Sequence, residues 1–163
     1  MSEPSRFVPT ADSDDPTALV ARAVERARAR PDDVASLIEA AYACDRWGTE
    51  EQAIEFYDAA WRCSVPGADR RRFMLGYGST LRNVGRHDEA VVVLGEATAA
   101  FADYAPLKAF LGLALHSAGH HKAAVATLVQ LCLDLAENGP QLDGYERALS
   151  EYQAALLSEA MAP

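Results

Sequence analysis

The chain has 163 residues, half of them hydrophobic, and a formal net charge of −9. This length suits one domain whose core needs no covalent staple, and the hydrophobic content excludes a disordered protein. The acidic balance argues against nucleic acid as a partner, because a phosphate backbone calls for clustered cations. Three scattered cysteines without a C-x-x-C pair fit free thiols better than a disulfide framework.

Two further features of the sequence bear on location. It lacks the charged start, apolar centre and cleavage site of a secretion signal. It also lacks any run of about 20 apolar residues that would cross a bilayer. The expected location is therefore cytoplasmic, with no membrane partner.

The first residues differ in character from the rest of the chain. Residues 1–14 are mostly small or polar and include two prolines, so we expect a disordered or loosely ordered arm there. Asp15 suits a helix N-cap, and Pro16 suits the first helical position. These two residues predict that a single domain, 15–163, begins with a helix.

A pattern of small residues then repeats along the chain. Three times a glycine is followed five residues later by an alanine, and the glycines are 37 and 34 residues apart: Gly48 with Ala53, Gly85 with Ala90, and Gly119 with Ala124. Seven residues before each glycine stands another small residue: Ala41, Gly78 or Gly112. A period near 34 residues is typical of tetratricopeptide helix pairs. We expect repeats at about 34–67, 71–104 and 105–138, with the extra residues of the first interval around 64–67.

The small residues have a physical role in such a repeat. A glycine in the left-handed conformation ends the first helix of a pair, which we expect at Gly48, Gly85 and Gly119. Small residues on facing stripes let the two helix axes approach closely. The expected facing pairs are Ala41–Ala53, Gly78–Ala90 and Gly112–Ala124, with larger residues such as Leu37, Cys44 and Trp47 on their flanks.

The predicted fold is all-α: a right-handed superhelix of three antiparallel helix pairs with an extra helix at each end. Capping-box patterns at Thr49–Gln52 and Asp143–Glu146 mark two helix starts. The helices are expected at about 16–30, 34–47, 50–63, 69–84, 87–101, 105–118, 121–136 and 143–160.

A longer motif points to a known family. The stretch 76–86, GYGSTLRNVGR, resembles the G-S-T-L-R-N-x-G-R element of the tetratrico-peptide-repeat group 5 proteins, a group of small bacterial proteins. The third repeat, FLGLALHSAGHHKAAV, and the later YERA at 145–148 are also similar to that group's pattern. The resemblance covers roughly 15–157, and it departs at Ala102-Asp103, where the group usually has Pro-Asp. It implies a cytosolic, dimeric helical-repeat protein without an assigned activity.

The first helices of successive pairs are expected to line a concave groove, where partners of such proteins bind. The predicted partner-binding residues on these helices are Tyr42, Arg46, Arg72, Ser79, Arg82, Asn83 and His116. A guanidinium fork can hold both oxygens of a peptide carboxylate. The alternative is that Arg46 or Arg82 only pairs with Asp45 or with water. The groove interpretation predicts an interaction scaffold or adaptor for a peptide or protein.

A second interpretation is a structural or regulatory homodimer. The helix at 121–136 is apolar on nearly every side, which normally means that it is covered all round. A second copy would cover that helix and the outward side of 91–94. The alternative is a monomer in which the C-terminal helix covers it completely.

Catalytic and metal-binding patterns are weak. His116, His120 and His121 form a cluster, and the spacing of the first two suits metal ligation. However, Gly119 interrupts the helix between them and no acidic residue completes the set. The basic triplet 70–72 is isolated in an acidic chain. We therefore expect no metal, no cofactor and no enzymatic activity, with a small-molecule or metal-dependent activity as the third alternative.

Overall fold

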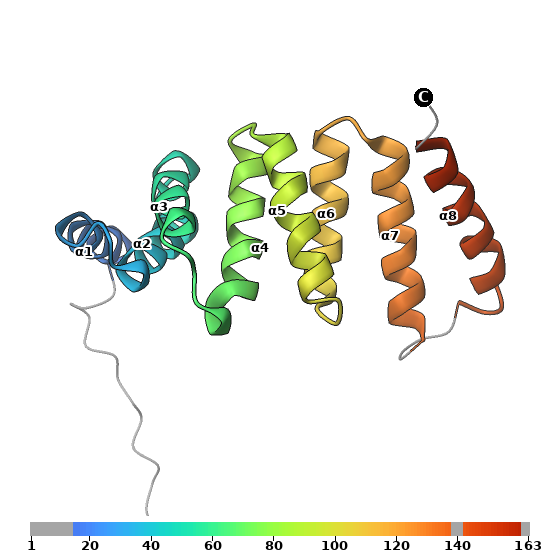
Figure 1. The fold of residues 1–163 in the computed structure, drawn as a ribbon, viewed down its shortest axis with the longest axis horizontal. Helices are drawn as coiled ribbons and strands as arrows, with labels where there is room; N and C mark the ends of the chain where they lie inside the picture. Colours follow the sequence, from blue (N-terminus) through green and yellow to red (C-terminus); the bar gives the residue numbers. More distant parts are fainter. Residues whose placement is uncertain (1–14, 138–141, 161–163) are drawn as a thin grey trace, which may run out of the picture.

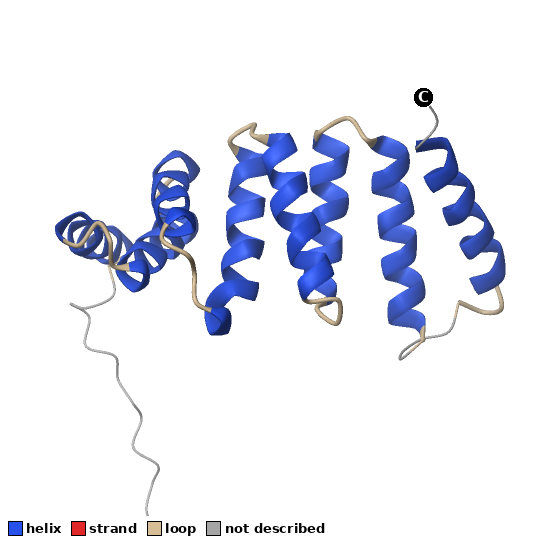
Figure 2. Cartoon of the chain, in the orientation of Figure 1, coloured by secondary structure: helices blue, strands red, loops and turns tan. Residues whose placement is uncertain are grey.

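A computed structural model describes residues 15–137 and 142–160. These ranges form helices and connecting turns, with no strand among them (Figure 2). The predicted arm at 1–14, and the ends of the predicted domain at 161–163, lie outside the described residues. The helices are α1 (Pro16–Ala29), α2 (Val34–Trp47), α3 (Glu50–Arg62), α4 (Gly67–Asn83), α5 (His87–Ala100), α6 (Ala105–Ser117), α7 (His121–Ala136) and α8 (Glu146–Ala160).

The helices stack in chain order from α1 at one end to α8 at the other (Figure 1). Three pairs, α2–α3, α4–α5 and α6–α7, are packed along their lengths, while α1 covers α2 and α8 covers α7. The first helices of successive pairs also touch, because α4 packs against both α2 and α6. The all-α stack of three pairs with an extra helix at each end is confirmed, while its superhelical hand stays a prediction.

Two of the three predicted glycine turns adopt the expected conformation. Gly85 and Gly119 have φ angles of +83° and +84°, and the next residue in each case donates its N–H to a carbonyl in the preceding helix. The prediction is wrong at Gly48, where φ is −103°. Gly48 is itself the C-cap of α2, whereas Gly85 follows the C-cap of α4, and Thr49 is already the N-cap of α3.

Gly78 in α4 and Gly112 in α6 each allow the next helix of the pair to pack closely. A Cβ atom built on Gly78 would lie 2.4 Å from Cγ of Leu94, and one built on Gly112 would lie 2.8 Å from Cγ of Leu128. The space that each glycine leaves is thus filled by a leucine one turn beyond the alanine expected to face it. In both pairs a leucine side chain lies against the bare backbone of the preceding helix.

The first two pairs meet through aromatic rings instead. Tyr57 of α3 is fully buried, and its ring lies 5.4 Å from Phe73 and 5.8 Å from Tyr77, both on α4. Trp61 stacks on Phe73 with nearly parallel ring planes. Ring pairs at these distances add to the stabilisation that area burial gives. The aromatic cluster therefore joins α3 to α4 across the link between the first two repeats.

Helix caps explain the boundaries that the sequence predicted well and one that it did not. The Asp15 carboxylate accepts the N–H of Thr17, and the Thr49 hydroxyl accepts the N–H of Gln52, as expected. The capping box at Asp143 is wrong: this residue is left-handed, with φ +54°, and α8 starts three residues later. The Glu146 carboxylate accepts the N–H of Leu142 instead.

Among the described helices, none has the length and apolar character that a membrane crossing requires.

Candidate functional site

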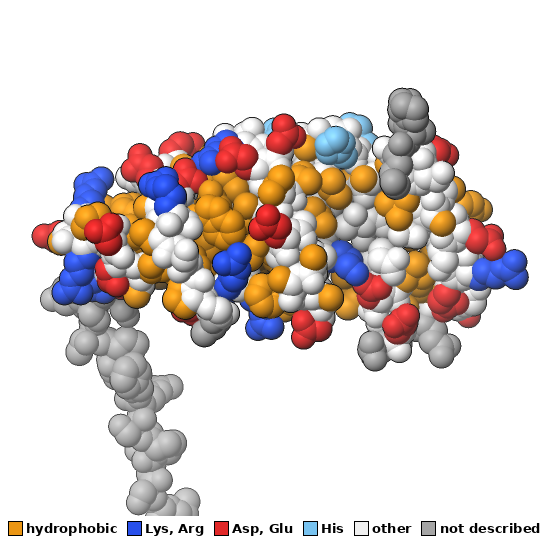
Figure 3. Space-filling view, viewed as in Figure 1, with side chains coloured by type: hydrophobic (Ala, Val, Ile, Leu, Met, Phe, Trp, Pro, Cys, Tyr) orange, Lys and Arg blue, Asp and Glu red, His pale blue; other side chains and the backbone are white. Residues whose placement is uncertain are grey.

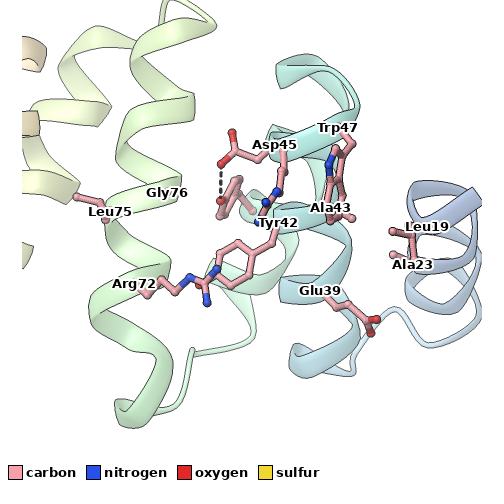
Figure 4. Close-up of a pocket in the computed structure, with 12 residues that line it drawn as sticks. Leu19, Ala23, Glu39, Tyr42, Ala43, Asp45, Trp47, Arg72, Leu75 and Gly76 are labelled. Carbon is pink, nitrogen blue, oxygen red and sulfur yellow. Dashed lines mark hydrogen bonds between the residues drawn. The ribbon is translucent and has the colours of Figure 1, made fainter. Parts of the chain in front are cut away.

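A cavity of about 470 Å³ opens between α1, α2 and α4 (Figure 4). Its walls come from the first helices of two successive pairs, from the end helix α1, and from one residue of α3. The lining residues are Leu19, Ala23, Glu39, Tyr42, Ala43, Asp45, Arg46, Trp47, Tyr57, Arg72, Leu75 and Gly76. We call this space the groove cavity. Hydrophobic side chains are exposed near α3 and α4 on the face that Figure 3 shows.

Two guanidinium groups in the groove cavity lack an acidic partner. The Arg72 guanidinium carbon lies 4.8 Å from the centre of the Tyr42 ring, and that of Arg46 lies 4.8 Å from the Trp47 ring. Such stacking holds a cation in place without using its N–H donors. Within the described residues, neither arginine makes a hydrogen bond or an ion pair, so their donors are available to a bound anion.

The carboxylates of the groove cavity, by contrast, are already engaged. Glu39 pairs with Arg26 of α1. Asp45 accepts hydrogen bonds from the Tyr57 hydroxyl at 3.3 Å and from the Thr80 hydroxyl at 3.2 Å. Although part of Asp45 is exposed, the packing around its carboxyl group raises its pKa. The groove cavity therefore presents free cations in a chain that is acidic as a whole.

The hydroxyl group of Tyr42 is buried and has no hydrogen-bond partner within the described chain. Burial also raises the pKa of this hydroxyl, so it is neutral and can donate a hydrogen bond. A buried polar atom without a partner costs free energy unless a bound group satisfies it. Tyr42 therefore adds an unused donor beside the two free arginines.

The structure brings together only part of the predicted partner-binding set. Tyr42, Arg46 and Arg72 line the groove cavity, whereas Ser79, Arg82, Asn83 and His116 do not. The last three of these make contacts within the chain. Arg82 donates to Asn83 at 2.7 Å, Asn83 donates to Glu50 of α3, and His116 meets His121. The alternative pairing of Arg46 or Arg82 with Asp45 does not occur in the described residues.

The histidine cluster differs from the expected geometry. His116 pairs with His121 across the turn between α6 and α7, with 3.1 Å between their Nδ1 atoms, rather than with His120. Histidines lie in this region of the surface in Figure 3. No group of three or more His, Cys, Asp or Glu residues suited to a metal ion occurs in 15–137 or 142–160.

Nine of the twelve residues that line the groove cavity were not predicted as site residues, and three of these nine show why. Trp47 was expected to pack on the flank of the Ala41–Ala53 contact with Leu37 and Cys44, but its side chain is 45% exposed and lines the cavity, so that prediction is wrong. Leu19 and Ala23 come from α1, which was expected only to cover the end of the stack. Leu19 and Ala23 are four positions apart and so share one face of α1, which is the sequence pattern that could have indicated their place in the cavity.

Comparison with known proteins agrees with the stacked helix pairs. The family model described as tetratrico peptide repeat matches residues 34–156. No curated protein and no solved structure gives a significant match. The matched range begins at α2 and ends within α8, so it includes all three helix pairs.

Proposed function

Because the chain belongs to the tetratrico peptide repeat family, whose stacked helices present extended binding surfaces, we propose that it is a scaffold that binds a peptide or protein partner in the groove cavity. One observation supports this most strongly. Arg46 and Arg72 stack on aromatic rings there with no acidic partner in the described chain. A non-catalytic role and a cytoplasmic location stay predictions.

The chemistry of the groove cavity favours a partner segment with a carboxylate beside an apolar side chain. A guanidinium group can donate two parallel hydrogen bonds to one carboxylate, and the unpartnered Tyr42 hydroxyl supplies a further donor. Leu19, Ala23 and Leu75 give the cavity apolar walls, and the exposed Trp47 ring can cover an inserted side chain. The free cations fix the carboxylate, while the apolar walls hold the neighbouring residue.

Substituting both free arginines tests this proposal. The R46A/R72A variant is expected to bind a captured partner at least about tenfold more weakly, because hydrogen bonds to a charged group contribute about 1.5–3 kcal/mol each. Partners would be captured from a native lysate on the tagged protein. Their affinities for both proteins would then be measured by titration.

The matched control is R28A/R30A, which removes two exposed arginines outside the groove cavity. This control should retain every partner. If R46A/R72A retains the same partners with unchanged affinity, the groove cavity is not the binding site.

A homodimer is a second candidate, supported by the exposed apolar surface of the last two helices. Val125 and Leu135 of α7 are 49% and 54% exposed, and Tyr152 of α8 is 68% exposed. Among the described residues, those that line a cavity of about 290 Å³ beside these helices are all apolar: Val125, Leu128, Val129, Cys132, Leu142 and Leu149. Large exposed apolar patches are uncommon on monomers. Of the predicted outward side of 91–94, Val92 is exposed and Val91 is half-buried, whereas Val93 and Leu94 are buried in the core.

Light scattering across a dilution series tests the dimer. The unchanged protein is expected to show twice the monomer mass at high concentration, and V125S/L135S is expected to shift the equilibrium to monomer. L113S, which alters an exposed leucine of α6, is the matched control and should remain dimeric. A monomer at every concentration would contradict this candidate.

A further inference from the structure

A second cavity lies between α3 and α5, the second helices of two consecutive pairs, and so on a different set of helices from the groove cavity. Its volume is about 520 Å³. The residues that line it are Asp58, Trp61, Arg62, Tyr77, Arg86, Asp88, Glu89, Val92, Val93 and Glu96. Four carboxylates and two guanidinium groups are in this set, so the lining is negatively charged.

One wall of this cavity is fixed by a hydrogen-bonded network. The Arg86 guanidinium donates to both Asp58 oxygens, at 2.7 and 3.0 Å, and to both Glu89 oxygens, at 2.6 and 2.7 Å. The Tyr77 hydroxyl also donates to Asp58, at 2.7 Å. These bonds from Arg86 hold the pKa of Glu89 below its usual range. Asp58 and Glu89 therefore share the single positive charge of Arg86, so this network keeps one net negative charge.

The outer edge of the cavity has free acidic groups around an exposed valine. Asp88 and Glu96 are exposed, and neither makes a hydrogen bond or an ion pair within the described chain. Val92 lies midway between them and is 59% exposed. The three residues are four positions apart, so they share one face of α5. With a rise of 1.5 Å per residue, the two carboxylates are about 12 Å apart along the helix.

The opposite wall adds apolar surface and one cation. Trp61 of α3 is partly buried and lines the cavity, with its ring stacked on Phe73 behind it. Arg62 also lines this wall and is exposed. Arg70 of α4 does not line the cavity, but its guanidinium carbon lies 5.3 Å from the centre of the Trp61 ring. The four carboxylates and two guanidinium groups of the lining still leave a net negative charge, with Asp88 and Glu96 on either side of Val92.

From this arrangement we infer that the cavity between α3 and α5 is a second docking site, and that its occupant is a basic amphipathic helix of a partner protein. Such a helix would present two lysine or arginine residues eight positions apart, with an apolar residue midway. Its rise matches that of α5, so the two cations meet Asp88 and Glu96 while the apolar side chain enters beside Val92 and Trp61. This site does not depend on the groove cavity.

A designed peptide tests this site directly. The probe is an acetylated, amidated alanine-based peptide of seventeen residues, with lysine at its fifth and thirteenth positions and leucine at its ninth. Binding would be followed by Trp61 fluorescence in the W47F variant, since Trp47 and Trp61 are the only tryptophans of the chain. Saturable binding is expected at peptide concentrations below about 1 mM. The same peptide with glutamate in place of both lysines should not bind.

Adding D88N/E96Q to the W47F variant is expected to weaken peptide binding at least tenfold. Adding D32N/D103N, which removes two exposed carboxylates outside the cavity, should leave the affinity unchanged, and so should R46A/R72A. Unchanged peptide affinity in the R46A/R72A background would show that the peptide does not bind in the groove cavity. The inference is overturned if the lysine peptide does not saturate, if the glutamate peptide binds equally well, or if D88N/E96Q leaves the affinity within twofold.

Discussion

Replacing Gly78 with valine is expected to lower the free energy of unfolding by about 1–3 kcal/mol, the usual cost of added carbon atoms in a packed core. Even the new Cβ atom would lie 2.4 Å from Cγ of Leu94, a fully buried side chain. Leu94→Ala alone is expected to cost about 2–5 kcal/mol, because it leaves a cavity. Both values would be measured by urea unfolding monitored through the helical circular dichroism signal.

The double variant G78V/L94A makes this test specific. Valine at position 78 would occupy part of the space that Leu94 vacates, so the double variant should be more stable than the two single effects predict, by at least about 1 kcal/mol. Gly95 provides the control, because a Cβ atom built there meets no atom within 4 Å. Gly95→Val should change stability by only about 0.5 kcal/mol. Additive costs, or an equal loss at Gly95, would contradict the close packing of α4 against Leu94.

Replacing Tyr57 with alanine is expected to cost about 3–5 kcal/mol, the range found for removing large buried aromatic side chains. Tyr57 is fully buried and its ring contacts those of Tyr42, Phe73 and Tyr77. Because these rings belong to α2 and α4, the loss should loosen the contact between the first two pairs. The free energy of unfolding in guanidinium chloride, together with the near-ultraviolet circular dichroism of the aromatic side chains, would measure the effect.

Phenylalanine at the same position is the matched control. Tyr57→Phe keeps the ring and removes only the hydroxyl that donates to Asp45 at 3.3 Å, so a loss of about 1 kcal/mol or less is expected. Should the alanine and phenylalanine variants be equally stable, the aromatic cluster would not be what joins α3 to α4.

The helices themselves were predictable because glycine and alanine recur with a fixed period. Most predicted boundaries lie within one or two residues of the structure. The errors arise where the same short sequence pattern is compatible with two backbone conformations. Gly48 and Gly85 occupy matching positions, yet only Gly85 is left-handed. Likewise Asp143 and Glu146 have the spacing of a capping box, but the left-handed Asp143 directs the Glu146 carboxylate to Leu142 instead.

The groove cavity was predictable only in part. Tyr42, Arg46 and Arg72 were found because helical spacing places them outside the stripe of small residues through which α2 and α4 were expected to pack on their paired helices. Asn83 lies at the end of its helix, where it donates to a residue of the preceding pair, and spacing along one helix does not reveal such a contact. Trp47 was missed because large apolar residues are normally assigned to the core.

The α3–α4 link connects the two walls of the groove cavity. It contains the left-handed Ser64, with φ +64°, and it joins two sets of helices that are inclined to each other in Figure 1. Tyr42 and Arg46 stand before this link in the chain, whereas Arg72 and Leu75 stand after it, and all four line the same cavity. Inserting residues into this link is therefore expected to change the spacing between the two walls of the groove cavity, and with it the size of the partner segment that can enter.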